Sequence, residues 1–596
     1  MDMSVNLPLV TPRHDPGTRV PLYQLLAEDI ARLGAPVFGL MSDDTMLLAA
    51  TLDALGSGFH GARHENSAIA MAEGHASATG ELGIALIGRG PAAANALHGA
   101  VYASRTGSKV LLVFGDGASL DENPNRPGPD GKAFDAAGVL RAAGLPTFVA
   151  RTPETARAVL DEAVQAARRG TAAALLLPLD VQRTMIDPGV TPETPVPADS
   201  TPRAAASHPT AAHPAAAHPA AAHPAAPRLA APRAQAIAAA ASRLSPSRKP
   251  LFVAGLGAHR AGAKEAIEAL AEHTGGVLAT TLKAKDMFRG NPWNLGIIGS
   301  FSHSAARQLI DQADCVVVFG ASFNQRTTSG GEALPHAAPV IHVDLVRSHI
   351  GRWGPADLAV VGDAREVAQQ LAAALQPRTA ADKPFHVDTV RQKLAGFDMT
   401  SEFRPEHTNR TVDPRALAVE LDRLLPADRN LVYDSGNFLQ VVPYLGTRGP
   451  AHFKHTSDFF SVGMGFGTAL GFASARPGEP TVLVIGDGGF AMTLNELDTA
   501  AREDIPLIVV VLNDCAYGAE RHYLELERMP IARAIFPDVD YAPVAEAFGF
   551  RTATIRSLED LRRAAPLLQA PDGPVLLDCK INAAIAAPFT PEMAAH

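Results

Sequence analysis

Short apolar runs alternate with longer amphipathic stretches along most of this chain. In the first third, strand-like runs lie at 37–40, 83–87, 109–114 and 173–177. Helix-like stretches lie at 45–55, 66–79 and 92–104. Strands that alternate with helices in this way predict a parallel, doubly wound sheet. We therefore expect an α/β domain over residues 18–185.

The same texture returns twice further along the chain. Strand-like runs at 250–254, 315–319 and 340–343 alternate with amphipathic stretches at 263–273, 304–312 and 364–375. They predict a second α/β domain over residues 235–378, and a third follows over 412–585. The expected fold class is therefore α/β, with three doubly wound parallel-sheet domains.

One segment breaks this texture. Residues 187–234 are rich in Pro, Ala, Thr and His, and a His-Pro element recurs every five residues at His208, His213, His218 and His223. Proline at this density opposes both helix and sheet, so we expect an extended linker. The histidines could bind a transition metal, but we favour a repeat-expanded linker in which they are incidental.

Bulk composition sets limits on function. The chain has 596 residues, 47% of them hydrophobic and 19% charged, with a net charge of −10. No basic cluster stands out, which disfavours nucleic-acid binding. No run of about 18 apolar residues predicts a membrane helix, and the N-terminus lacks a secretory pattern. Three widely spaced cysteines, Cys315, Cys515 and Cys579, fit a reducing cytoplasm.

The segment 481–518 carries the strongest indication of chemistry. An apolar run at 481–485 ends in Gly-Asp-Gly, a helical stretch follows, and a second run at 507–512 ends in Asn-Asp. In a βαβ unit both strand ends meet at one sheet edge, so Asp487 and Asp514 should lie side by side. Two carboxylates beside a glycine turn suit Mg²⁺ on a diphosphate. The alternative is a glycine turn in some other α/β protein.

This pattern resembles the cofactor motif of thiamine-diphosphate (ThDP) enzymes, which opens with Gly-Asp-Gly and closes with Asn-Asn. The resemblance implies that Mg²⁺ is held by Asp487, Asp514 and the backbone carbonyl of Ala516. It also implies cofactor contacts from the glycines of the first turn, Gly486, Gly488 and Gly489. Asp514 stands where most members carry Asn, so we expect Mg²⁺ binding to persist with an altered affinity.

A second motif supplies the acid that this chemistry needs. ThDP acts through an ylide, which forms when a shielded carboxylic acid drives the aminopyrimidine into its imino form. The stretch 61–80 resembles the family's sequence around that acid, and the resemblance makes Glu65 the cofactor-activating residue. The alternative is a glutamate that only favours the start of a helix through the dipole.

Further positions follow from the same resemblance. The turn at 434–438 resembles the segment that holds the diphosphate, which implies contacts from Asp434, Gly436 and Asn437. In the stretch 461–471, glycine spacing indicates Val462 as the apolar wedge under the cofactor, while the local Met-Gly-Phe-Gly string indicates Met464. After the metal motif, Tyr517 and Gly518 would approach the cofactor. Glu520 and His522 are candidate acid/base groups, or part of a solvated helix face.

The order of the three domains resembles the acetolactate synthase, pyruvate oxidase and benzoylformate decarboxylase family of ThDP enzymes, of which this chain looks like a divergent member. The resemblance implies a pyrimidine-binding domain, a central nucleotide-fold domain and a diphosphate-binding domain. It also implies a homodimer or homotetramer with a shared active site.

The resemblance implies an enzyme that acts on 2-oxo acids, a transferase or lyase. The protonating histidines of pyruvate and benzoylformate decarboxylases are missing, which favours a carboligase with an aldehyde or ketone acceptor. A decarboxylase or 2-hydroxyacyl lyase is the first alternative, and a non-catalytic ThDP-fold binding protein is the second. Arg89 could meet a substrate carboxylate, and Asp116 stands where many acetolactate synthases carry Gln.

The central domain raises the question of a further cofactor. The stretch 320–330, followed by the apolar run at 340–346, resembles the region that lines the FAD site of acetolactate synthases. We expect a nucleotide fold without flavin.

Overall fold

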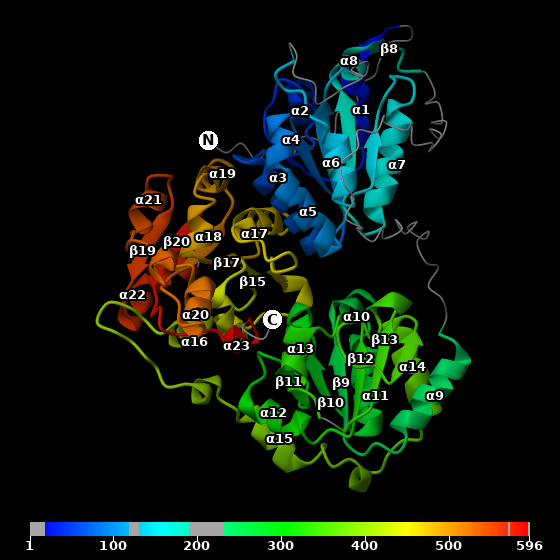
Figure 1. Ribbon diagram of the computed structural model, residues 1–596, viewed down its shortest axis with the longest axis vertical. Coiled ribbons are helices and arrows are strands. Elements are labelled where there is room, and N and C mark those ends of the chain that lie inside the picture. Colours follow the sequence, from blue (N-terminus) through cyan, green and yellow to red (C-terminus); the bar gives the residue numbers. More distant parts are fainter. Residues whose placement is uncertain (1–17, 119–129, 190–231, 336, 570–572, 594–596) are drawn as a thin grey trace, which may run out of the picture.

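Three six-stranded parallel sheets, each flanked by helices, make up the body of the protein (Figure 1). The computed structural model describes residues 18–118, 130–189, 232–335, 337–569 and 573–593. The predicted α/β fold class with three doubly wound sheets is confirmed. The histidine repeat of the predicted linker lies outside the described residues.

The first domain contains the strand order β3-β2-β4-β5-β7-β6. Its strands are β2 (Val37–Gly39), β3 (Phe59–Gly61), β4 (Gly83–Ile87), β5 (Val110–Asp116), β6 (Thr147–Val149) and β7 (Ala173–Pro178), and β1 (Val20–Pro21) pairs with β8 (Met185–Ile186) outside the sheet. Its helices are α1 (Leu22–Ala31), α2 (Met46–Ala54), α3 (Glu65–Thr79), α4 (Pro91–Asn95), α5 (Leu97–Thr106), α6 (Ala136–Ala142), α7 (Ala156–Arg168) and α8 (Leu179–Arg183). The single helix predicted at 92–104 is two helices that meet at Ala96.

The central domain has the order β11-β10-β9-β12-β13-β14. Its strands are β9 (Pro250–Ala254), β10 (Val277–Thr280), β11 (Asn294–Ile297), β12 (Cys315–Phe319), β13 (Val340–Asp344) and β14 (Leu358–Val361). Its helices are α9 (Ala234–Leu244), α10 (Leu256–Arg260), α11 (Lys264–Thr274), α12 (Ser304–Ile310), α13 (Gln325–Thr328) and α14 (Ala364–Ala374), and α15 (Asp388–Ala395) follows.

The third domain has the order β16-β15-β17-β18-β20-β19. Its strands are β15 (Asn430–Tyr433), β16 (Phe453–His455), β17 (Thr481–Gly486), β18 (Leu507–Asn513), β19 (Arg551–Ile555) and β20 (Val575–Lys580). Its helices are α16 (Pro414–Leu424), α17 (Met464–Ser474), α18 (Asp487–Ala491), α19 (Glu496–Arg502), α20 (Gly518–Leu526), α21 (Ala542–Glu546), α22 (Leu558–Gln569) and α23 (Thr590–Met593).

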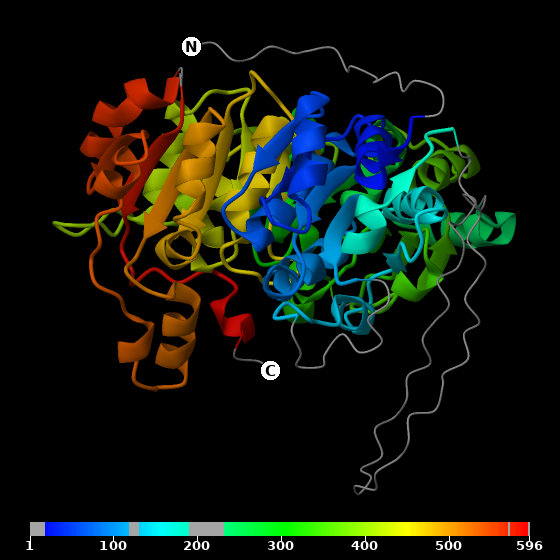
Figure 2. The ribbon, with the colours of Figure 1, turned by 90° about the horizontal axis from the view of Figure 1, so that it is seen from above.

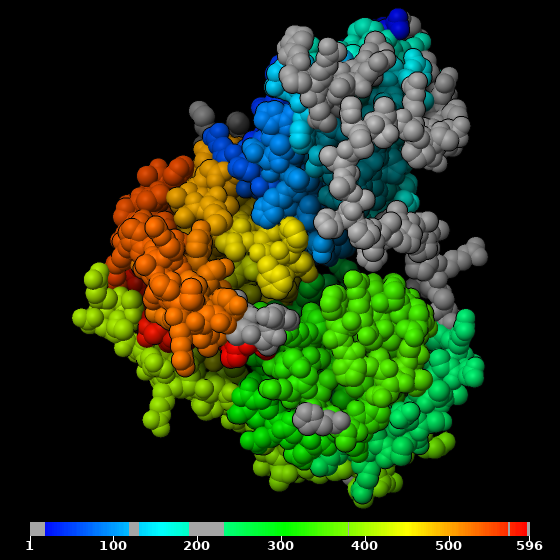
Figure 3. Space-filling model, in the orientation of Figure 1, coloured from blue at the N-terminus to red at the C-terminus, as the bar shows by residue number. Residues whose placement is uncertain are grey.

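One hydrophobic core cluster contains residues of both the first and the third domain. Helix α3 packs along α17, which lies between the two domains (Figures 1 and 2). Glycines allow this close approach, because a Cβ on Gly74 would lie 2.1 Å from the carbonyl oxygen of Thr468. The space-filling view shows the third domain in contact with both of the others (Figure 3).

A buried ion pair fixes the register of α3 against the third domain. The Glu73 side chain is fully buried and accepts hydrogen bonds from Tyr102 (3.0 Å), Ser108 (2.7 Å) and Lys454 (2.6 Å). A buried charge needs such partners, so this cluster specifies how the two domains meet. No helix among the described residues is long and apolar enough to cross a membrane.

Candidate cofactor and active site

The C-terminal ends of β17 and β18 bring two carboxylates together. The strands pair in parallel from Thr481 opposite Leu507 to Gly486 opposite Leu512, as the βαβ prediction requires. Asp487 and Asp514 follow these ends and lie in hydrogen-bond contact. Burial raises the pKa of both carboxyls, and the neighbouring charge of Asp487 raises that of Asp514 further. Two buried carboxyl groups in contact form a donor set that suits a divalent cation.

The turn after β18 is held in an unusual conformation. Cys515 has a φ of 55°, and its backbone N–H donates to the side-chain oxygen of Asn513 (3.2 Å). Next along the chain, Ala516 is buried and forms an antiparallel bridge with Ile535. Among the described residues, no group of three or more His, Cys, Asp or Glu side chains converges as a metal site. A cation between Asp487 and Asp514 would thus complete its shell with backbone carbonyl, water or phosphate oxygens.

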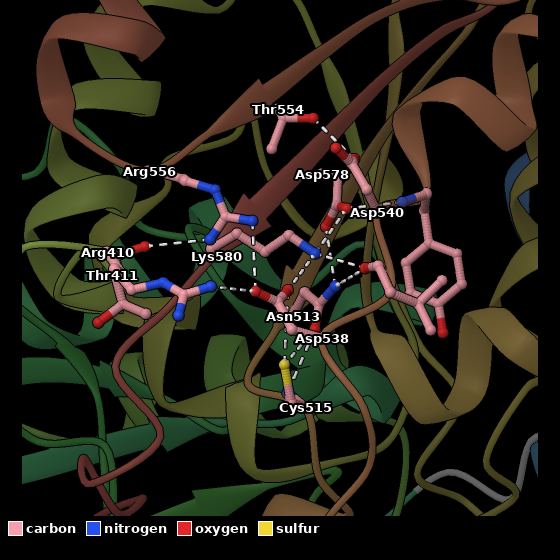
Figure 4. A network of polar contacts seen from close by, with 12 residues as sticks. Arg410, Thr411, Asn513, Cys515, Asp538, Asp540, Thr554, Arg556, Asp578 and Lys580 are labelled. Carbon is pink, nitrogen blue, oxygen red and sulfur yellow. Dashed lines mark hydrogen bonds and ion pairs between the residues drawn. The ribbon is translucent and has the colours of Figure 1, made fainter.

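A network of polar side chains lies against this turn (Figure 4). The buried Lys580 ammonium lies 2.9 Å from Asp538 and 3.0 Å from Asp578. Asp578 also accepts from the Asn513 amide (3.0 Å), while Arg556 pairs with Asp538 (3.3 Å). Although burial opposes its charge, the hydrogen bonds to these two carboxylates raise the pKa of Lys580. Burial raises the pKa of the Cys515 thiol to about 11, which disfavours the thiolate near neutral pH.

The turn after β15 forms the next part of the edge. Asp434 is fully buried and accepts from the backbone of Gly463 (2.7 Å) and Gly465 (3.0 Å) and from the Thr456 hydroxyl (3.0 Å). Burial raises the pKa of Asp434 to about 6. A Cβ on Gly489 would lie 2.4 Å from an Asp434 oxygen, so this position of the glycine-rich turn excludes a side chain. Asp434 therefore joins the turn before α17 to the turn after β17.

The two wedge candidates occupy different environments. Met464 is buried and clusters with Ala70 and Tyr102 of the first domain. Val462 is half-buried, and its Cγ1 lies 3.3 Å from the position of a Cβ on Gly489. The side chain of Val462, rather than that of Met464, is therefore the one beside the glycine-rich turn.

The remaining predicted cofactor positions lie around the same edge. A Cβ on Gly518 would meet an Asp514 oxygen at 2.3 Å and Asn437 at 3.2 Å. A Cβ on Gly488 would lie 2.7 Å from the Tyr517 ring. This ring packs edge-on against Phe536. Gly436 lies in the turn after β15, Gly486 ends β17, and Gly488 lies in the first turn of α18. Small residues are needed here because the three turns approach one another closely.

The two acid/base candidates of α20 do not share one environment. Glu520 is exposed, whereas His522 is 4% exposed and its Nδ1 lies 3.1 Å from Glu525. Residues two apart on a helix point in nearly opposite directions. At most one of the two can thus face a reacting centre at this edge.

Glu65 is the first residue of α3, and residues 62–64 connect it to β3. His64 caps the helix by accepting from the Asn66 N–H (3.1 Å), and Asn95 donates to the Glu65 carboxylate (3.3 Å). The Glu65 side chain is 13% exposed. Within one chain its polar neighbours come from the first domain.

Helix α19 fastens the turn that carries Glu65. The fully buried carboxylate of Glu496 accepts from the Arg63 N–H (3.2 Å), and Asp498 pairs with the Arg63 guanidinium (2.6 Å). Glu503, just beyond the helix, accepts from the Gly61 N–H (3.3 Å). Because α19 is also the crossover between β17 and β18, one helix connects both halves of the candidate site.

A cavity of about 500 Å³ opens at the C-terminal ends of β5 and β7. Arg89 lines it but is held by Asp44 (3.0 Å) and Asp130 (2.6 Å), two partners that the sequence did not suggest. Its charge is thus already matched, which weakens its predicted contact with a substrate carboxylate. Asp116 also lines the cavity, and burial raises its pKa.

Comparison with known families agrees with this geometry. Models of the thiamine pyrophosphate enzyme N-terminal TPP binding domain, central domain and C-terminal TPP binding domain match residues 23–138, 237–371 and 434–579. The three matches follow the order of the three sheets.

Curated relatives match over most of the chain. A probable acetolactate synthase large subunit of Methanocaldococcus jannaschii is 27% identical over 89% of this chain and 86% of its own length. An acetolactate synthase of Arthrospira platensis is 25% identical, with 87% and 86% covered. The acetolactate synthase isozyme 3 large subunit of Escherichia coli is 24% identical, with 82% and 81% covered.

We predict that Lys580→Met destabilises the third domain by about 3 kcal/mol, because it leaves the carboxylate of Asp578 buried without its counter-charge. Arg562→Met is the matched control. Arg562 is an exposed cation that pairs with Glu420 (2.8 Å), so its loss should cost far less than that of Lys580, because solvent screens the pair. Urea unfolding measures both variants, and equal costs would refute a structural role for the buried pair.

Asp434 predicts a pH dependence of the cofactor-free protein. Its pKa is about 6 when folded and 3.8 as a model value, so the folded state binds the proton more tightly. The contribution of Asp434 to stability is then greatest below about pH 4, and roughly 3 kcal/mol of it is lost as pH rises through 6. Asp434→Asn lacks this component. Urea titrations measure the unfolding free energies of both proteins, and that of the variant should rise relative to that of the wild type between pH 4.5 and 7.5. A difference that stays constant over this range would contradict the raised pKa of Asp434.

Proposed function

Since the chain belongs to the thiamine pyrophosphate (ThDP) enzyme family, we propose that it is a ThDP- and Mg²⁺-dependent enzyme acting on 2-oxo acids, a carboligase of the acetolactate synthase type. The contact between Asp487 and Asp514 at the edge of β17 and β18 carries this proposal. The names of the curated relatives support the choice of a carboligase.

The residues at the edge fit the cofactor. Asp487, Asp514 and the carbonyl of Ala516 would hold Mg²⁺. The turns around Asp434 and Asn437 would hold the diphosphate, together with Gly436, Gly486, Gly488, Gly489, Tyr517 and Gly518. Glycines allow the segments of this edge to approach one another closely, because a Cβ on Gly488, Gly489 or Gly518 would collide with neighbouring protein atoms. Val462 would support the cofactor from below, since it is the wedge candidate that lies beside Gly489.

Bound ThDP would supply a carbon nucleophile for the carbonyl of a 2-oxo acid and an electron sink for the pair released with CO₂. Glu65 would hold a proton at the aminopyrimidine ring nitrogen, where a carboxylic acid is needed. Its turn is immobilised by Glu496 and Asp498, which keeps the carboxyl in one place. Asp116 and the cavity beside Arg89 would then contact the substrate.

The proposed assembly is a homodimer or homotetramer in which Glu65 of one chain faces the diphosphate edge of another. Two large apolar side chains beside Val462 support a partner at this position. Phe460 is 65% exposed and Met492 53% exposed, and Met492 lies against Gly463. Apolar side chains as exposed as these are typical of surfaces that another chain covers.

We predict that Glu65→Gln lowers turnover by at least about 100-fold while ThDP binding persists, because the amide cannot hold the proton. Glu81→Gln, an exposed glutamate of the same domain, is the control and should keep full activity. Turnover and isothermal titration with ThDP and Mg²⁺ are the two measurements. Unchanged turnover in Glu65→Gln would remove this residue from the mechanism.

A second prediction concerns the acid that replaces the family's Asn. At pH 8 we expect Asp514→Asn to bind Mg²⁺ up to about tenfold more weakly, because one negative ligand is lost. Binding should nevertheless persist, since the amide oxygen can still coordinate. Titration of Mg²⁺ in the presence of ThDP measures the change, and an affinity equal to that of the wild type would exclude Asp514 as a charged ligand.

The reaction itself is tested by product analysis. The protein with ThDP and Mg²⁺ is given a panel of 2-oxo acids, with and without aldehyde or ketone acceptors, and products are followed by mass spectrometry. CO₂ together with a coupled hydroxyketone is the predicted result. CO₂ with free aldehyde would instead indicate a decarboxylase. Cleavage of a 2-hydroxyacyl substrate would indicate a lyase, and no turnover despite bound ThDP would indicate a non-catalytic binding protein.

A further inference from the structure

The C-terminal tail, residues 582–593, leaves the third domain after β20 and reaches the central domain. Alternate side chains along it are buried, with Ile585 at 7%, Ala587 at 2% and Phe589 at 6% exposed. Its last helix, α23, lies between α20 of the third domain and α13 of the central domain (Figure 1). The tail is thus packed against two domains.

The first anchor of the tail is Asn437. The Asn437 amide donates to the carbonyl of Ile585 (3.1 Å), and its oxygen accepts from the Ala587 N–H (2.8 Å). The Gln440 amide donates to the same Ile585 carbonyl (3.1 Å). Both ends of the buried Asn437 side chain are therefore satisfied by tail backbone, and Asn437 lies against Gly518 on the edge that carries Asp514.

The second anchor is on the central domain. The Phe589 ring packs against Phe301, with ring centroids 5.8 Å apart, and the Arg326 guanidinium lies 4.1 Å above it. Glu592 accepts hydrogen bonds from the hydroxyls of Ser300 and Ser329 (3.0 Å for Ser329) and lies 3.5 Å from Arg326. One carboxylate thus joins three side chains of a neighbouring domain.

Arg326 depends on the tail. In the described part of the chain, the hydrogen bond, ion pair and ring contact of its guanidinium are made to Phe589 and Glu592. Arg326 and Ser329 belong to the stretch 320–330, which resembles a flavin-lining region. Both side chains are engaged by Glu592, so a ligand that used them would compete with the tail.

We propose that Glu592 is a positioning residue for the cofactor site. Its carboxylate locks the tail onto the central domain, and the locked tail holds Asn437 in place beside the turn of Asp514. The central domain thereby acts on the affinity for the cofactor although none of its residues needs to touch it. This inference rests on the proposed function for the identity of the ligand, ThDP with Mg²⁺.

The test compares Glu592→Ala, Arg326→Ala and the double variant in the full-length protein. Glu402→Ala is the matched control, because Glu402 also docks on the central domain through a serine and an arginine, Ser304 (3.1 Å to its N–H) and Arg307 (3.4 Å). Glu402 is not part of the tail. Hydrogen exchange of peptides covering 434–445 and 582–593 is measured without cofactor, and the dissociation constant for ThDP is measured at saturating Mg²⁺.

Each single variant in the tail lock should speed exchange in both peptides and raise the ThDP dissociation constant at least about fivefold. The double variant should be no worse than the more severe single variant, because both remove one shared contact. Glu402→Ala should match the wild type. Faster exchange confined to 582–593, or an unchanged dissociation constant, would overturn the proposal. If the wild type itself fails to bind ThDP, the proposed function fails, while the exchange of 434–445 still decides whether the tail holds Asn437.

Discussion

The contact between two acids at the ends of adjacent parallel strands is the constraint on which this site depends. Pairing of β17 with β18 forces Asp487 and Asp514 together, and burial makes their joint ionisation unfavourable. Without a ligand, this arrangement contributes little to the stability of the fold. A divalent cation would make it favourable, because the cation would match both negative charges. The glycines around it let the neighbouring segments pack closely, because a Cβ on Gly488, Gly489 or Gly518 would collide with protein atoms.

The second half of the site is tied to the first through packing. Helix α19 crosses from β17 to β18 and also holds the turn before Glu65 through Glu496 and Asp498. The buried Glu73–Lys454 pair and the close approach of α3 to α17 fix the same domain contact further along the helix. If Glu65 moved relative to the third domain of the same chain, all of these contacts would have to break together. The turn of Glu65 and the edge of β17 and β18 are therefore held rigidly within each chain.

Local periodicity and the βαβ rule were enough to predict many of the elements and the contact between Asp487 and Asp514. Strands at 250–254 and 315–319 lie where they were predicted, because long apolar runs bounded by polar residues have few other solutions. The partners of Arg89 and the docking of Glu592 could not be predicted. Asp44 and Asp130 lie more than 40 residues from Arg89, and Ser329 lies 263 residues from Glu592. No spacing rule connects such positions, and the same holds for the burial of His522 and of Met464.

The measurement that tests the central claim most directly is complementation between chains. Glu65→Gln and Asp487→Asn chains, each carrying a different affinity tag, are produced together and the mixed assembly is purified through both tags. If Glu65 of one chain serves the diphosphate edge of another, each mixed dimer holds one site with two intact halves. Activity should return to roughly half that of the wild type, although each variant alone is inactive. A mixed assembly as inactive as either variant would contradict a site shared between chains.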